Sequence, residues 1–445
     1  MHKYANVLLI ALAAGLALSS GAAGAEPQDV VLNLSEAVRI TVENNAVVKA
    51  ATENLKGAVY ASGSAKADRL PKISANYAYT YLADAPYLQV NGMPPAVQIA
   101  HADQYHWDLT MIQPLFSGFA LSTRHEIAKL GVKTKEKEKK QAILDVTKGV
   151  KSAYYNVLLT QKLLSVANET IESLRSHERD NQRFYDRGVI RLNDLLRSRV
   201  ALSNAIQNRE RAQAAVQMSL SDLNRWLAFD INRNTRIEDI ETITPKVYHL
   251  DELIQTGMQN RPLLQVLQLS LETLENVTQL EKSGYYPQVA LIGGYGQDGD
   301  NPQASNNNYS NEHNAWVAVQ AKWTFFDSFK TKSKVSKAKA DKGAFLQTIR
   351  SAEDGIRLEI KKAFLDLEVA EKNIETAKAS LTQAEENLRI TQLGYRQQAA
   401  TSTEVLDART DLTRAQTYYY VALYGYLEGV AALERATGLG QTLSG

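Results

Sequence analysis

Two carboxylates near the end of the chain, Glu404 and Asp407, have the spacing to act together. They stand three positions apart, so on a helix they would share one face. Thr401 and Glu404 also fit the Thr-x-x-Glu capping box, and acidic side chains are favourable at a helix N-terminus. Capping does not require Asp407, however. If three copies of the chain met around one axis, the two positions would supply a ring of six carboxylates, which could narrow a pore and attract cations.

The other residues with catalytic or metal-binding potential form no recognisable constellation. Cysteine is absent, and the histidines beyond the N-terminal segment lack HExxH or HxH spacing. These histidines are His101, His106, His125, His177, His249 and His313. The glycines of 293–296 lie in a strand pattern rather than before a helix, and the acidic segment 298–300, which could bind a cation, is better explained as a solvated hairpin loop. The sequence therefore predicts no enzyme activity, no cofactor and no metal site.

The first residues have the pattern of an export signal. Lys3 is followed by the apolar stretch 7–18 and by small residues at 23–25, a typical cleavage site. The apolar stretch is too short to span a bilayer as a helix, which disfavours a retained anchor. We predict a signal peptide over 1–25 and a mature chain with 49 basic and 49 acidic residues, since Lys3 is removed from a total of 50 basic residues. Such a balance offers no basic surface for nucleic acid.

Beyond the signal, the chain reads as two copies of one unit, predicted as 26–232 and 233–445. A shift of 216 residues, and further along of 210, superimposes matching residues without a gap. The matches include Leu34 with Leu250, Asn44 with Asn260, Pro71 with Pro287, Tyr79 with Tyr295, Phe116 with Phe326, Tyr185 with Tyr395 and Arg199 with Arg409. The shift changes between Tyr79 and His106, a polar stretch that should be a loop, because loops tolerate insertions. Chance similarity between Ala-rich helices would not hold one register over two long blocks.

Each copy shows the same order of elements. A helix (about 45–69, and 261–284) ends before a proline, and two strands with period-two alternation of apolar and polar residues follow. A very long helix then begins (about 120–185 in the first copy), with small and large apolar residues alternating along a coiled-coil seam. A last helix covers about 192–229 or 402–437. The strand residues on one face are Ile73, Ala75, Tyr77, Tyr79 and Tyr81; Tyr105, Trp107, Leu109 and Met111; Val289, Leu291 and Tyr295; and Val317, Val319, Ala321, Trp323 and Phe325.

These lengths predict the architecture. The long helix spans about 100 Å, and the two shorter helices of one copy add up to nearly the same length, which suits the wall of a tube. Each strand has about the length of a tilted transmembrane strand. The four strands of one chain cannot close a barrel. Two chains would give eight strands and a barrel whose interior is filled by side chains, whereas three chains give twelve strands and leave a lumen.

The combined pattern resembles the TolC-like outer-membrane efflux family over nearly the whole mature chain. The residues that carry the resemblance are Leu34-Ser35-Glu36-Ala37, Leu70-Pro71-Lys72-Ile73, the segment 114–119, Tyr185-Asp186-Arg187-Gly188, Asn193-Asp194-Leu195, Tyr286-Pro287, the segment 325–329, Tyr395 and the segment 404–408. The resemblance implies a homotrimer with a 12-stranded outer-membrane β-barrel, four strands per chain, continuous with a long periplasmic α-helical coiled-coil barrel. The implied protein lies in the outer-membrane lipid with a large periplasmic part. It exports small molecules or polypeptides, in a tripartite efflux or type I secretion system, together with a periplasmic adaptor (membrane fusion protein) and an inner-membrane transporter.

The resemblance also implies a periplasmic gate. Its acidic rings match Glu404 and Asp407, and a closing hydrogen bond matches Tyr395 and Asp194. The adaptor-facing helix tips match Gly188, Arg191 and Arg396. Two family residues are replaced: Ala400 stands where an arginine is expected, for which Arg191 or Arg396 could substitute. Gln398 stands where a glycine equivalent to Gly188 is expected.

Two other classes of protein share part of this pattern. A periplasmic adaptor also has helical hairpins, but one hairpin inside a split β-domain rather than two matched ones. A structural coiled-coil envelope protein would leave the aromatic, alternating strands unexplained. For the channel, the loops 83–104 and 297–313 should face the cell exterior.

Overall fold

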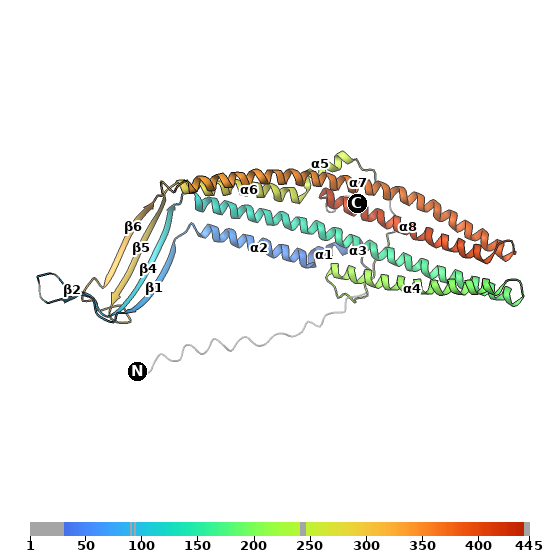
Figure 1. The fold of residues 1–445 in the computed structure, drawn as a ribbon, viewed down its shortest axis with the longest axis horizontal. Helices are drawn as coiled ribbons and strands as arrows, with labels where there is room; N and C mark the ends of the chain where they lie inside the picture. Colours follow the sequence, from blue (N-terminus) through green and yellow to red (C-terminus); the bar gives the residue numbers. More distant parts are fainter. Residues whose placement is uncertain (1–30, 90, 93–94, 241–245, 440–445) are drawn as a thin grey trace, which may run out of the picture.

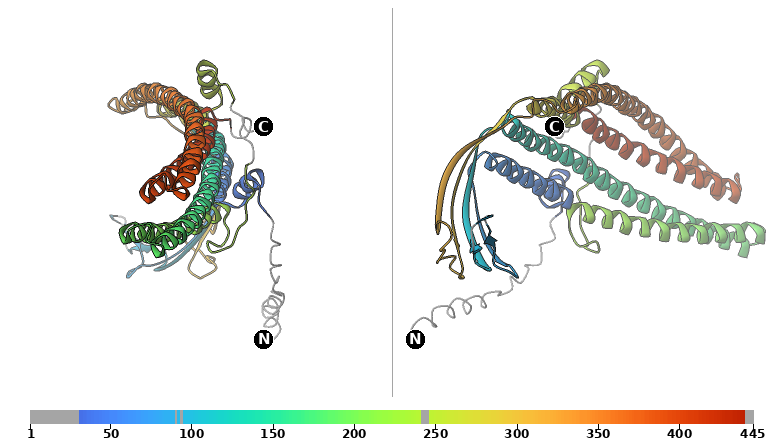
Figure 2. Two further views of the ribbon diagram at one scale, coloured as in Figure 1. Left: turned by 90° about the vertical axis from the view of Figure 1, so that its right-hand side faces the viewer. Right: turned by 60° about the vertical axis from the view of Figure 1, so that its left-hand side comes forward.

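The computed structural model describes residues 31–89, 91–92, 95–240 and 246–439. A small sheet lies at one end of an elongated molecule, and long helices run from it to two hairpin tips at the other end (Figure 1). Seen along its length, the helical part curves into an arc, like a segment of a tube wall (Figure 2). In the ranges given above, no helix is both long and apolar enough to cross a membrane. The predicted signal peptide, 1–25, lies outside the described residues.

The two halves of the chain contain the same elements in the same order. The first half has α1 (Leu34–Asn44), α2 (Ala46–Ala67), β1 (Lys72–Tyr81), β4 (Asp103–Phe116), α3 (Ala120–Asp186) and α4 (Leu192–Leu227). The second has α5 (Leu250–Asn260), α6 (Pro262–Lys282), the short η1 (Ser283–Tyr285), β5 (Gln288–Gly299), β6 (His313–Lys322), α7 (Lys330–Arg396) and α8 (Ser402–Thr437). Helices α3 and α7 have 67 residues each, and α4 and α8 have 36 each. A two-stranded ribbon, β2 (Tyr87–Leu88) with β3 (Val97–Gln98), stands in the loop between β1 and β4.

Left-handed backbone positions recur at the same places in both halves. Four pairs of residues that are 210 positions apart all have positive φ: Gly118 and Ser328, Phe119 and Phe329, Gly188 and Gln398, Ala228 and Gly438. The first two pairs form the entrance to the long helices, the third the hairpin turn, and the last the end of the final helix. Such positions are uncommon for residues other than glycine, so the tertiary fold must enforce them.

The four long strands form one antiparallel sheet in the order β1-β4-β5-β6. The register places Ile73 beside Met111, Met111 beside Gly293, and Gly293 beside Val317. Because side chains alternate along a strand, this row belongs to one largely apolar face, as the sequence predicts. The next row, which includes Gly294 and Trp316, belongs to the opposite face.

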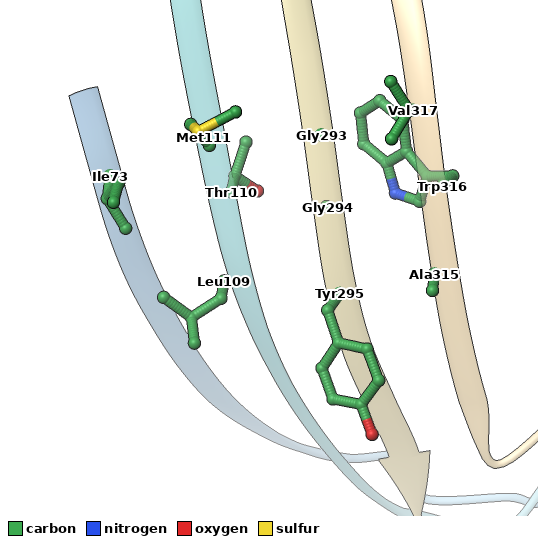
Figure 3. Close-up of a pocket in the computed structure, with 10 residues that line it drawn as sticks. All are labelled: Ile73, Leu109, Thr110, Met111, Gly293, Gly294, Tyr295, Ala315, Trp316 and Val317. Atoms are coloured by element: carbon green, nitrogen blue, oxygen red, sulfur yellow. The ribbon is translucent and has the colours of Figure 1, made fainter. Parts of the chain in front are cut away.

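Ten residues line a shallow hollow of about 450 Å³ across the middle of this sheet (Figure 3). A Cβ at Gly294 would come within 2.6 Å of the Trp316 indole, so only glycine allows the indole to lie over this strand. Polar side chains gather on the same face as Gly294. There His106 contacts Asp298 at 2.7 Å and Asp108 at 3.1 Å, and Thr110 donates a hydrogen bond to Asp108 at 2.9 Å.

The last strand ends earlier than the sequence predicts. The alternating pattern extends to Phe325, but β6 stops at Lys322. Beyond it, the Trp323 Nε1 donates to the backbone oxygen of Tyr285 at 3.1 Å, and the Trp323 ring meets Phe325 edge to face. The pairing ends at Lys322 because its partner Gln288 is the first residue of β5, so Trp323 and Phe325 have no residue opposite them in the ladder.

The hydrophobic core lies around the middle of the helical part. One cluster joins α1, α3, α4 and α8 around Tyr154, Leu158, Leu223 and Leu227. Another joins α5, α6, α7 and α8 around Ile360, Leu367 and Leu433. The predicted seam is buried there, with Val150, Val157 and Ile360 fully covered. Even so, the chain exposes 28479 Å², well above the roughly 17,000 Å² expected for a compact monomer of this size.

Candidate functional site: the helical tips

The candidate gate residues lie at the two hairpin tips, far from the sheet (Figure 1). Each tip closes with the same turn: Gly188 N–H donates to the Tyr185 oxygen at 2.8 Å, and Gln398 N–H donates to the Tyr395 oxygen at 3.0 Å. Their φ angles are +73° and +60°. The second tip therefore keeps the geometry of the first although Gln398 replaces the glycine. Left-handed backbone costs a residue with a Cβ roughly 1–2 kcal/mol.

A buried polar cluster joins the two hairpins just above the tips. The Tyr395 hydroxyl of α7 donates to Asn181 Oδ1 of α3, and Asn181 Nδ2 donates to Ser402 Oγ of α8 at 2.9 Å. The Nε2 of His177, one turn before Asn181, lies 2.9 Å from the same Ser402 oxygen. Asn181 is fully buried, and the other three are at least nine-tenths buried. The cluster thus fastens the long helix of one hairpin to both helices of the other.

The hydrogen bond implied between Tyr395 and Asp194 does not form within this chain. Asn181 lies between the two residues: its carbonyl oxygen accepts from Tyr395, while its amide nitrogen lies 3.5 Å from the backbone oxygen of Asp194. Asp194 acts on Tyr395 only through its charge. Sequence reasoning missed His177, Asn181 and Ser402. The available signal was a polar residue, Asn181, where the apolar seam of the long helix continues.

Burial sets the protonation states of this cluster. It raises the pKa of Tyr395 to about 12, an effect to which the charges of Asp194 and Asp180 add. The hydroxyl is therefore a proton donor at any physiological pH. Burial also lowers the pKa of His177, and the nearby Asp180 charge opposes this only in part. A neutral imidazole therefore contacts Ser402 at neutral pH.

Glu404 has the capping role that the sequence permits. Its carboxylate accepts from Thr401 N–H at 2.7 Å, and its own N–H donates to Thr401 Oγ1 at 3.3 Å, which completes a capping box. Asp407 is exposed on the same side of α8 and forms no hydrogen bond or ion pair with any described residue. Helix capping therefore explains why an acidic residue stands at Glu404 but not why one stands at Asp407.

The two arginines at the tips do not replace the missing family arginine inside one chain. Arg191 is the residue before α4 and makes no side-chain capping bond. Arg396 ends α7 and is exposed. Neither forms an ion pair with a carboxylate among the described residues, and Asp194 and Asp407 remain without a cationic partner there. Those same ranges contain no group of three or more acidic or histidine side chains that could hold a metal ion.

The sequence profile of the outer membrane efflux protein family matches residues 38–228 and 253–439, which include both tips and the whole sheet. The chain belongs to that family. Membership confirms the resemblance drawn from the sequence and places the protein in the outer membrane, with the long helices as its large periplasmic part. It excludes the adaptor and the structural coiled coil as alternatives.

Solved structures share the fold at low sequence identity. The Campylobacter jejuni CmeC outer membrane channel has a TM-score of 0.79 and 16% identity, with 93% of this chain and 87% of that chain covered. VceC, an outer membrane protein of Vibrio cholerae, has a TM-score of 0.76 and 16% identity, with 91% of this chain and 96% of that chain covered. The open state of the Neisseria gonorrhoeae MtrE outer membrane channel has a TM-score of 0.73 and 16% identity, with 91% of this chain and 88% of that chain covered. No curated protein matches the sequence.

Proposed function

We propose that three copies of this chain form one export channel, in which a 12-stranded barrel in the outer membrane continues into a periplasmic helical tube. The observation that carries the proposal is the sheet. It is amphipathic and only four strands wide, and within the described chain β1 and β6 each pair along one side alone. Unpaired edges on an exposed sheet need a partner, and in lipid every backbone group must be paired. Joining β6 of one copy to β1 of the next would close the sheet.

The exposed side chains support this arrangement. On the apolar face, Ile73 is 69% exposed, Val317 78% and Val319 66% in the single chain. Residues of this kind would be costly to leave in water but suit a lipid-facing surface. The opposite face, with His106, Asp108 and Asp298, would then line the lumen.

The matched halves support a tandem duplication, with 26–232 and 233–445 as its units, intertwined in one channel. The recurrence of left-handed positions 210 residues apart supports this duplication, since four pairs coincide and several of them hold residues other than glycine, which rarely adopt this conformation. In this proposal the two tips, with Gly188, Arg191 and Arg396, meet a periplasmic adaptor. Through the adaptor they connect the channel to an inner-membrane transporter, and the channel carries small molecules or polypeptides outward.

We further propose that the tips form the gate. Glu404 and Asp407 of three copies would form an acidic ring that favours cations and narrows the pore. The contact of Tyr395 with Asn181 would hold each pair of hairpins in the closed arrangement, with Asp194 beside it. The channel itself would catalyse no reaction.

Disulfide cross-linking tests the assembly, because the natural chain has no cysteine to interfere. Variants would pair Asn76→Cys on β1 with a cysteine at 314, 316 or 318 on β6, so that bonds form only between copies. At least one pair should give a covalent trimer on a non-reducing gel. The control, Asp108→Cys with Gly296→Cys, joins two positions that are paired within one chain and should leave monomers. Covalent dimers as the largest product, or native mass spectra with only monomers or dimers, would rule out the trimer.

A further inference from the structure

The guanidinium of Arg409, on α8, is buried without a carboxylate to balance it. The residue is 6% exposed. Its Nη2 donates to Thr170 Oγ1 of α3 at 2.8 Å, while its Nε has no hydrogen-bond partner among the described residues. Leaving a buried charged donor unpaired is costly, so such a group usually has a ligand or a partner.

Nearby acidic side chains do not satisfy this charge. The charge of Glu169 acts on Arg409, but the Glu169 carboxylate accepts its hydrogen bond from Gln416 at 3.1 Å. Asp411 pairs with Arg414 at 3.4 Å. Burial lowers the pKa of Arg409, and the charge of Glu169 opposes this only in part. Arg409 still remains a cation, because a guanidinium in a protein keeps its proton at any physiological pH.

The corresponding arginine of the first half behaves differently. Arg199, which lies 210 residues earlier, has a side chain that is 52% exposed. It donates to Glu178 at 3.1 Å and to Gln182 at 2.7 Å. The same position of the duplicated pattern thus holds a solvated, paired arginine in α4 and a buried, unbalanced one in α8.

Arg409 lines a groove of about 590 Å³ between α3, α4 and α8, here called the Arg409 groove. About half of its lining is leucine, valine and alanine, and the rest is threonine, asparagine and the two arginines Arg409 and Arg414. None of these lining side chains is acidic. The volume lies in the range of sites for small organic ligands.

We propose that the Arg409 groove binds a small amphipathic carboxylate, whose anionic head meets Arg409 and whose apolar body covers the leucine and alanine side chains. The planar guanidinium offers N–H donors in a fork that matches a carboxylate. The hydroxyls of Thr170 and Thr413 line the same site, but they already donate to the backbone oxygens of Val166 and Arg409, so the guanidinium supplies the charged donors. A ligand held there would contact α4 and α8 together and so bridge the two hairpins.

The experiment uses the assembled protein in amphipol and calorimetric titration with three probes. These are 1-adamantanecarboxylate, the neutral 1-adamantanemethanol with the same body, and acetate with the same head. The carboxylate should bind at least about tenfold more tightly than the alcohol, because hydrogen bonds to a charged group are stronger than those to a neutral one. It should also bind at least about tenfold more tightly than acetate, because acetate lacks the body that covers the apolar lining. Arg409→Met, which keeps the packing but removes the charge, should weaken carboxylate binding by about tenfold or more and leave the alcohol unchanged.

Two further variants keep the test decisive. Arg199→Met removes the matched but solvated arginine and should bind like the natural protein. If Arg409→Met fails to assemble, Arg409→Lys takes its place in the test. It keeps a positive charge and should retain part of the natural protein's affinity for the carboxylate. The proposal is overturned if the alcohol or acetate binds as tightly as the carboxylate, or if Arg409→Met binds the carboxylate normally. It is also overturned if the natural protein binds none of the probes, which is the result expected of a groove that a second copy or a protein partner fills.

Discussion

Removing the Tyr395 hydroxyl is the most direct test of how the hairpins are held together. In Tyr395→Phe the ring remains, so the packing against His177 and Phe184 is kept. What is lost is the hydrogen bond donated to Asn181 Oδ1, together with the contact of the hydroxyl with Ser402. Because Asn181 is fully buried, no water replaces the lost donor.

The structure sets the size of the effect. A buried acceptor left without its donor costs about 1–3 kcal/mol. This cost falls on the arrangement in which α7 touches α3, and it disappears once the hairpins separate and water reaches Asn181. The closed-to-open equilibrium of one subunit should therefore shift by about 5- to 150-fold. If the subunits of the proposed channel open together, their shifts combine.

The open probability in planar bilayers at low voltage measures this shift. Tyr395→Phe should raise it strongly, and Asn181→Leu should do the same, since it removes the acceptor. The matched control is Tyr185→Phe: Tyr185 occupies the equivalent position of the first half but is 38% exposed, so its loss should change little. Asp194→Asn should also have a small effect, because it removes a charge but no hydrogen bond to Tyr395.

Two results would refute this reasoning. If Tyr395→Phe channels stay as closed as Tyr185→Phe channels, the Asn181 contact does not hold the gate. If Asp194→Asn opens the channel as much as Tyr395→Phe does, the closing bond in the assembled channel reaches Asp194, as the family resemblance implied.

Four further outcomes are expected. Glu404→Gln with Asp407→Asn keeps the capping box but removes both charges, so cation selectivity and block by multivalent cations should fall; unchanged selectivity would leave the carboxylates as helix caps only. Gln398→Gly should relieve about 1 kcal/mol of left-handed backbone strain at the second tip. Local opening there, measured by hydrogen exchange of the Ala399 amide, should slow by a few-fold; faster exchange would contradict this. Burial lowers the pKa of His177, whereas in an opened tip the histidine has its ordinary pKa near 6.5. The tip should therefore lose stability as pH falls below about 6.5. His177→Gln should abolish this pH dependence, whereas His249→Gln should not. A peptide tag after Asn307 should be labelled on intact cells, and labelling only after permeabilisation would reverse the topology.

Much of the fold could be predicted from the sequence because its signals are local. The helix predicted at 120–185 ends one residue later, and the helix predicted at 402–437 has those same bounds. A seam that repeats every three or four residues, or a proline that ends a helix, acts within a few positions of the chain. The duplicated order of such elements was also enough to indicate the family.

Local signals did not predict where regular structure is interrupted by distant contacts. The sequence predicted a helix start near 45, close to that of α2, but did not predict α1 before it. Asn45 separates the two helices; its side chain accepts from Val47 N–H at 2.9 Å and donates to the Trp226 oxygen at 3.2 Å. The end of β6 depends on the neighbouring strand, because Lys322 pairs with Gln288, the first residue of β5. At Gln398 the fold imposes a glycine-like turn on a residue whose own preference is against it.

The sequence by itself determined the helices, the alternating strands and the chemical character of the tips: two carboxylates and a tyrosine. Only the tertiary structure decided their partners, because those contacts join residues more than 200 positions apart. Tyr395 meets Asn181 rather than Asp194, and Arg409 is buried while its counterpart Arg199 is solvated. A duplicated sequence gives both copies the same local preferences. Packing α3 against α7 and α8 then places Tyr395 and Arg409 at helix contacts, while Tyr185 and Arg199 remain on the surface, and so separates their roles.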